Sequence, residues 1–114
     1  MTGVRIGILG PLEVRDGTGR PVEISGPRLR ALLVRLALEP GRPVSAARLL
    51  DDLWDDDPPG GNALQALVSR LRAATGRDVI GHGPAGYRLA LDPSAVDAVA
   101  FERAVAAARA LPDP

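Results

Sequence analysis

NALQALVSRLR, residues 62–72, combines the apolar stripe of an amphipathic helix with polar groups suited to nucleic acid. Four aliphatic residues recur at the spacing of one helix face: Leu64, Leu67, Val68 and Leu71. Amide, hydroxyl and guanidinium groups lie off this stripe: Asn62, Gln65, Ser69, Arg70 and Arg72. Such groups can read base edges, because Arg pairs with guanine and Asn or Gln pairs with adenine. The same pattern also fits an ordinary surface helix, so the rest of the chain has to decide between the two.

The composition is that of one domain with an aliphatic core. The chain has 114 residues, of which 46% are hydrophobic, and it has no cysteine for disulfides or thiolate metal sites. Its longest apolar runs are interrupted by arginine and no signal segment is visible, so we expect a cytoplasmic protein without a membrane span. One His and no nucleophile or metal-ligand constellation exclude most catalytic chemistry. We therefore expect no enzyme, no metal and no cofactor.

The formal net charge is zero, but the charges are unevenly distributed along the chain. Residues 62–91 contain four arginines and one acid, Asp78, whereas residues 51–57 contain five aspartates and no base. A basic segment beside an acidic one suggests two surfaces with different partners.

The N-terminal part of the chain predicts a small antiparallel sheet. Short extended runs occur at residues 4–9, 12–15 and 21–24, and Asp16-Gly17-Thr18-Gly19 between the last two is a strong turn signal. Such a sheet needs a helix on one face to be stable.

Two helices are expected next, at about residues 27–39 and 46–54. Pro27 suits the first turn of one, and Ser45 suits the N-cap of the other. Trp54, the only tryptophan, falls on the inner side of the second helix and is expected in the core.

An acidic loop broken by prolines, residues 55–61, separates the second helix from the third. The third helix contains the opening stretch, runs from about residue 60 to Thr75, and ends at Gly76. Residues 43–44 are expected to add one short extended pairing. Two strands are expected next, at residues 78–80 and 87–91, joined by a glycine-rich tip at residues 81–86. A last helix follows at residues 96–111.

This order predicts an α+β fold: a winged helix-turn-helix with a small N-terminal antiparallel sheet, three helices and a C-terminal β-hairpin wing. In that arrangement the third helix is presented to the major groove. We assign residues 1–93 to this domain and residues 94–114 to a helical linker or the start of a further domain. Phe101 in the last helix needs a hydrophobic partner, either in the core or in that further domain.

Two further groups of basic residues are candidates for DNA contacts. Arg28 and Arg30 lie near the start of the first helix, where backbone N–H groups favour an anion. They are either phosphate contacts or solvated helix-end arginines. His82, in the expected hairpin tip, is either a solvated loop histidine or a contact to the minor groove or a phosphate.

Five segments resemble, in their order, the DNA-binding domain of the actinobacterial antibiotic-regulatory proteins, the SARP or AfsR-like group. That domain is a winged helix of the OmpR/PhoB type. The segments are GILGPLEV (7–14), GPRLRALL (26–33), VSAARLLDDLWDDDPP (44–59), NALQALVSRLR (62–72) and GYRL (86–89). The later VDAVAFERAV (96–105) resembles the start of the bacterial transcriptional activation domain of these proteins.

The resemblance implies an activator of a secondary-metabolite gene cluster that binds promoter direct repeats as a head-to-tail pair and recruits RNA polymerase. By position, Gln65, Ala66, Ser69, Arg70 and Arg72 would contact the bases, with Asn62 at the start of the helix and with Arg28 and Arg30 on the DNA backbone. The family's wing often carries an Arg that enters the minor groove. Here the tip has none, which leaves His82 or Arg88 as a substitute.

The resemblance also assigns the loop between the second and third helices to polymerase or sigma factor. Asp55, Asp56 and Asp57 lie in this loop, where their charge would repel DNA and suit a basic protein partner. The alternative is a winged helix that serves only as a protein-interaction module, and the zero net charge favours that alternative.

Overall fold

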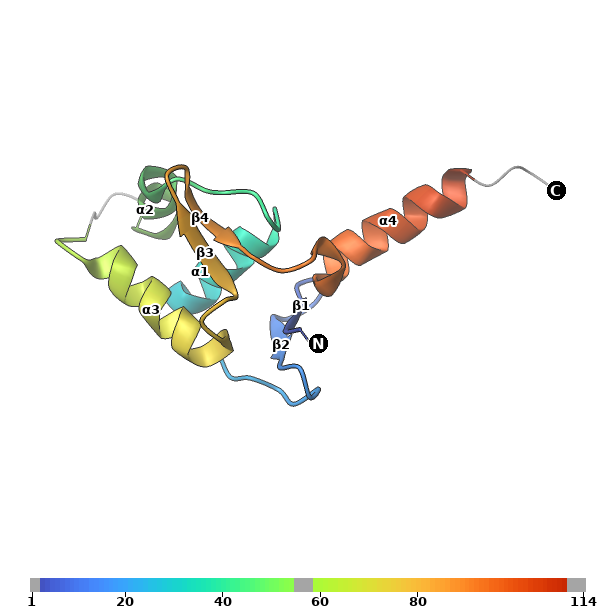
Figure 1. The fold of residues 1–114 in the computed structure, drawn as a ribbon, viewed down its shortest axis with the longest axis horizontal. Helices are drawn as coiled ribbons and strands as arrows, with labels where there is room; N and C mark the ends of the chain where they lie inside the picture. The colour runs from blue at the N-terminus through green and yellow to red at the C-terminus, as the bar shows by residue number, and fades with distance from the viewer. Residues whose placement is uncertain (1–2, 55–58, 111–114) are drawn as a thin grey trace.

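Figure 1 shows the computed structural model of the chain, which describes residues 3–54 and 59–110. Within these ranges the fold is α+β with two small antiparallel sheets, which confirms the predicted class, and no helix is long and apolar enough to cross a membrane. The elements in chain order are β1 (Arg5–Gly7), β2 (Glu13–Arg15), α1 (Pro27–Ala37), α2 (Ala46–Trp54), α3 (Ala63–Thr75), β3 (Ile80–Gly83), β4 (Gly86–Leu89), the 3-10 turn η1 (Pro93–Ala95) and α4 (Asp97–Ala110).

β1 and β2 pair antiparallel in the N-terminal sheet, but the third strand predicted at residues 21–24 is wrong. In the described part of the chain, this segment continues the sheet only through a bridge between Arg15 and Pro21 and a 2.8 Å hydrogen bond from Val22 N–H to the Val14 carbonyl. Pro21 has no N–H, so it contributes no donor to the sheet.

The turn predicted at residues 16–19 is confirmed. The Asp16 carboxylate accepts hydrogen bonds from the Thr18 hydroxyl (2.6 Å), the Thr18 N–H (2.8 Å) and the Arg20 N–H (3.1 Å). These bonds, above all the one from the Thr18 hydroxyl, hold the pKa of Asp16 below its ordinary value.

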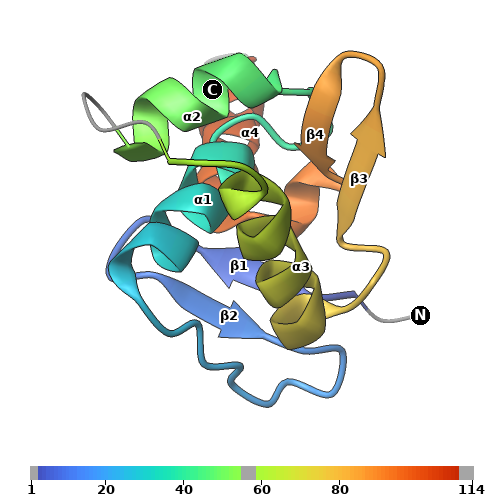
Figure 2. The ribbon, with the colours of Figure 1, turned by 90° about the vertical axis from the view of Figure 1, so that its left-hand side faces the viewer.

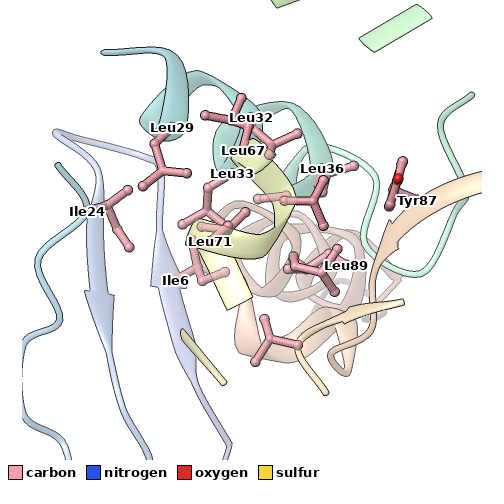
Figure 3. Packing of buried hydrophobic residues seen from close by; sticks show 14 of the residues in the cluster. Ile6, Ile24, Leu29, Leu32, Leu33, Leu36, Leu67, Leu71, Tyr87 and Leu89 are labelled. Carbon is pink, nitrogen blue, oxygen red and sulfur yellow. The ribbon is translucent and has the colours of Figure 1, made fainter. Parts of the chain in front are cut away.

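The core lies between α1, α3 and the two sheets (Figure 3). All four residues of the predicted α3 stripe are buried, as are five residues of α1: Leu29, Leu32, Leu33, Leu36 and Ala37. Burying a Leu side chain contributes about 2 kcal/mol, so these two apolar stripes stabilise the helices more than intrinsic propensity does.

The start of α2 is capped as predicted, but its end is less deeply buried than predicted. The Ser45 hydroxyl accepts a hydrogen bond from the Arg48 N–H (3.1 Å), and Leu49 is fully buried. Trp54 is half-buried and packs against the core from its edge, so it is not an interior residue.

β3 and β4 form the wing, and both strands are shifted toward its tip relative to the predicted residues 78–80 and 87–91. They pair up to Gly83 and Gly86, which reduces the expected six-residue tip to a two-residue turn. The predicted extended pairing is confirmed, because Val44 N–H donates to the Tyr87 carbonyl (2.7 Å) and Tyr87 N–H to the Val44 carbonyl (3.0 Å). A Cβ at Gly86, whose φ is +131°, would overlap the Val44 carbonyl, so only glycine fits.

The first residues of the last helical segment are anchored to the domain, while the rest of α4 extends away from it (Figure 1). Val96 is fully buried, and the Asp97 carboxylate accepts hydrogen bonds from the N–H groups of Ile8 (2.7 Å) and Leu9 (3.2 Å). Phe101 is 59% exposed, so α4 does not pack back on the core through this ring.

Candidate nucleic-acid interface

The exposed side of α3 carries the polar groups of the opening stretch. In Figure 2 this helix lies in front of α1, with the wing beside it and the N-terminal sheet below. Because the four aliphatic residues face α1 and the wing, the opposite side is free to meet a ligand. Five of the predicted DNA contacts are exposed there: Asn62, Gln65, Ala66, Ser69 and Arg70.

Arg70 lies on the flank of this exposed side that is nearer to α1. Its Nη2 is 3.9 Å from the point where a Cβ of Gly26 would be, at the start of α1. Arg70 has no hydrogen bond or ion pair with the part of the chain that the structure describes. Its guanidinium is therefore available to a base or a phosphate.

Arg72 differs from the expectation that it faces the groove with Arg70. Its side chain is half-buried, and its Nε and Nη2 both donate to the Ile80 carbonyl, at 3.1 and 2.9 Å. Helical residues two positions apart point about 200° apart around the axis, so Arg70 and Arg72 lie on opposite flanks of α3. Arg72 is directed toward the wing.

The two arginines of the α1 start are both exposed, but they are held differently. Arg28 Nε donates to the Leu53 carbonyl at the end of α2 (3.0 Å), and its guanidinium carbon lies 4.7 Å from the centre of the Trp54 ring. Arg30 is exposed beside the hollow between α1 and β2. Gly26 supplies no side-chain cap, and the first turn of α1 has no acidic residue, which leaves its N–H groups available to an anion.

The wing presents His82 and Arg88 on its surface. His82 lies on β3 and not in the tip, and its ring stacks on that of the buried Tyr87, with centroids 4.2 Å apart. Arg88 is paired with Gly81 across the hairpin and places its guanidinium over it, where a Cβ at Gly81 would lie 3.0 Å from Arg88 Cζ. A small residue at position 81 thus leaves room for the arginine.

Arg77 is a basic residue that the sequence-based prediction did not include. It is exposed in the short connection between α3 and β3. The signal available in the sequence was a basic residue between the predicted recognition helix and the predicted wing. Asp55, Asp56 and Asp57, the predicted polymerase contacts, lie outside the described residues.

Three helices with a capped α2, an exposed polar α3 and an antiparallel wing define a winged helix-turn-helix domain. The chain matches the family described as "Transcriptional regulatory protein, C terminal" over residues 19–89, and it belongs to this family. The family consists of transcriptional regulators, which confirms that the chain is not an enzyme.

Individual relatives agree with this assignment and confirm the resemblance to AfsR-like regulators. The chain is 37% identical to the regulatory protein AfsR of Streptomyces griseus, over 82% of this chain and 10% of AfsR. The structure of Mycobacterium tuberculosis EmbR in complex with a low-affinity phosphopeptide superposes with a TM-score of 0.77 and 32% identity, over 89% of this chain and 28% of EmbR. The DNA-binding domain of Bacillus subtilis CssR superposes with a TM-score of 0.61 and 25% identity, over 76% and 99% of the two chains.

The chain spans between 9% and 41% of the length of the curated relatives it matches. The similarity therefore concerns the winged-helix domain of these longer regulators.

Proposed function

We propose that this chain binds double-stranded DNA in a sequence-specific manner as the winged-helix part of a transcriptional regulator. α3 would lie in the major groove, with Gln65, Ser69 and Arg70 toward base edges. Ala66 would contact a thymine methyl, and Asn62 would reach the backbone near the start of the helix. Arg72 is left out of this set because its donors are directed to Ile80.

One observation carries the proposal: three arginines around α3 and the wing form no ion pair with the residues that the structure describes. Arg70, Arg77 and Arg88 are exposed, and none forms an ion pair with a carboxylate of the described residues. Uncompensated guanidinium groups beside an exposed helix are what a phosphate backbone binds, with release of counterions. The zero net charge therefore does not argue against DNA as the ligand.

The start of α1 supports a backbone contact next to α3. Arg28, Arg70 and residues of the first turn of α1 line one hollow, together with Asp52, whose carboxylate is bound to Arg35. Cations at a helix N-terminus oppose the helix dipole, and a phosphate placed there would relieve this. Arg30 would extend the contact along the same strand of DNA.

We further propose how the regulator assembles on DNA and how it activates transcription. A module of this size buries roughly 600–1,000 Å² on DNA, so two copies side by side on direct repeats would give tight binding. They would lie head to tail, as the resemblance to the AfsR-like group implies. The acidic residues Asp55, Asp56 and Asp57 would meet RNA polymerase or its sigma factor, and the regulator would activate genes of secondary metabolism.

The proposal is tested by selecting a target from a pool of random duplex DNA and measuring affinity for it by fluorescence anisotropy at several salt concentrations. Arg70→Ala should weaken specific binding by about 1–3 kcal/mol if the arginine is bidentate to a guanine. Arg42→Ala is the matched control, because Arg42 is also exposed but is paired with Glu39 (3.4 Å). We expect this control to bind like the wild type.

Two outcomes would contradict the proposal. If no duplex is enriched and no fragment is retained at low salt, the chain is the protein-interaction module considered above. If Arg70→Ala and Arg42→Ala bind the selected target equally well, DNA binding does not use α3. Footprinting of the selected target then shows whether protection covers one site or two direct repeats.

A further inference from the structure

Arg72 spans the whole connection between α3 and the wing. Its main-chain carbonyl accepts a 2.8 Å hydrogen bond from the Gly76 N–H, which ends the helix, while its guanidinium donates twice to the Ile80 carbonyl at the start of β3. The connection consists of residues 76–79 alone. One residue thus binds both ends of the segment that sets the direction of the wing.

The Ile80 carbonyl is available to Arg72 because of the register of the hairpin. Ala90 N–H donates to the Val79 carbonyl (2.7 Å), which makes these two residues a hydrogen-bonded pair. The next pair, Ile80 and Leu89, is then of the non-hydrogen-bonded kind, and its main-chain groups point away from the partner strand. The Ile80 carbonyl therefore lies on the open edge of β3, where Arg72 covers it.

The other polar link within this connection is weaker. Val79 N–H donates to the Gly76 carbonyl at 3.3 Å, and Gly76 has a φ of +120°, a conformation that allows a change of direction. A cationic donor with two bonds to one carbonyl is stronger than a neutral pair. Arg72 is thus the polar contact best placed to fix the wing relative to α3.

We propose that Arg72 is a positioning residue that sets the angle between the recognition helix and the wing, and not itself a DNA contact. The inference rests on the proposed DNA binding. A fixed angle would let α3 and Arg88 of the wing contact the same DNA duplex together. Removing the hydrogen bonds to Ile80 would leave α3 able to bind DNA, but the wing would no longer be held at a fixed angle to α3.

Two neutral substitutions separate this role from a charge contact. Arg72→Met keeps the apolar stem and has no donor, whereas the Nε2 of Arg72→Gln occupies the position of the arginine Nε and can donate to Ile80. If Arg72 positions the wing, Met should weaken binding to the selected target about tenfold, in the range of one lost interface contact, and Gln should restore most of the loss. If Arg72 binds a phosphate, both variants weaken binding equally and each lowers the salt slope by about 1.

A double-mutant cycle with Arg88→Ala provides a second arm. If Arg72 acts through the wing, Arg72→Met should cost less in the Arg88→Ala protein than in the wild type, because the wing contact is already lost. Additive losses would overturn the proposal.

Residual dipolar couplings of the free protein test the geometry without DNA. We expect the wing amides of Arg72→Met to report a changed or averaged orientation relative to α3, while the couplings of α1 stay the same and Arg72→Gln resembles the wild type. An unchanged wing in the Met variant would overturn the positioning role. Failure of the wild type to bind any DNA would instead refute the proposed function, and the couplings would still decide the role of Arg72.

Discussion

Arginines at the junction of α1 and α2 and arginines on the α3 and wing side have different partners. At the junction, the Arg35 guanidinium lies 2.8 Å from the Asp52 carboxylate and 3.1 Å from that of Glu39, which also pairs with Arg42. On the other side, Arg70 and Arg88 are exposed and form no ion pair within the described part of the chain. Both regions contain the same residue type, but within residues 3–54 and 59–110 only the first is neutralised by carboxylates.

The difference shows why a net charge of zero says little about the ligand. The hydrogen bond to Asp52 is the largest cause that raises the pKa of Arg35, so this cation is held by the fold. A guanidinium that is already bound to carboxylates gains little from a phosphate, whereas a free one releases counterions when a phosphate binds. The sum of charges hides this segregation.

Gly86→Ala should give the largest loss of stability, because it disrupts the packing of the wing that carries Arg88. The alanine would combine a φ of +131° with overlap on the Val44 carbonyl, so we expect a loss of about 3–5 kcal/mol in the free energy of unfolding, measured with urea. Gly83→Ala is the control, because a Cβ there meets nothing within 4 Å, and it should change stability by less than about 0.5 kcal/mol. Equal losses in the two variants would show that the Val44 contact does not constrain the wing.

Much of the fold could be predicted from short-range patterns. The stripe of Leu64, Leu67, Val68 and Leu71 is buried because helical spacing alone decides which residues share a face. The cap at Ser45 also follows from local chemistry, since its hydroxyl satisfies a helix N–H that has no other partner.

The positions of long side chains could not be predicted with the same certainty. An arginine reaches partners that are distant in sequence, and Arg28 finds the Leu53 carbonyl 25 residues away. Nothing in the sequence gives the hairpin register that turns the Ile80 carbonyl toward Arg72. One rule was available and unused: residues two apart point about 200° apart around a helix, which predicts Arg70 and Arg72 on different flanks of α3.

Arg35→Met tests the neutralised region and should have a moderate effect on stability alone. The side chain is 19% exposed and its two carboxylates are each 41% exposed, so solvent screening limits the loss to about 1 kcal/mol. Arg42→Met, at a side chain that is 78% exposed, should cost almost nothing. Neither variant should change the affinity for the selected DNA. A loss of affinity in Arg35→Met comparable to that in Arg70→Ala would break the distinction between the two regions.

Asp16→Asn should give the smallest effect, at a carboxylate whose partners are mainly the N–H and hydroxyl groups of its own turn. Because the pKa of Asp16 is lowered by folding, chiefly through the Thr18 hydroxyl, its contribution to stability is present above the ordinary aspartate pKa of 3.8. That contribution is lost as the pH falls through the lower pKa of the folded state.

The thermal midpoint of Asp16→Asn should therefore lie slightly below that of the wild type at neutral pH, and the difference should shrink as the pH is lowered below 3.8. Thr18→Ala removes the hydroxyl donor and should reproduce part of this pH dependence while keeping the carboxylate. A difference between Asp16→Asn and the wild type that stays constant across this pH range would mean that the turn does not stabilise the ionised form. In contrast to Arg35, whose guanidinium bridges α1 and α2, Asp16 holds only its own turn, and for this reason its removal should leave the packing of both regions unchanged.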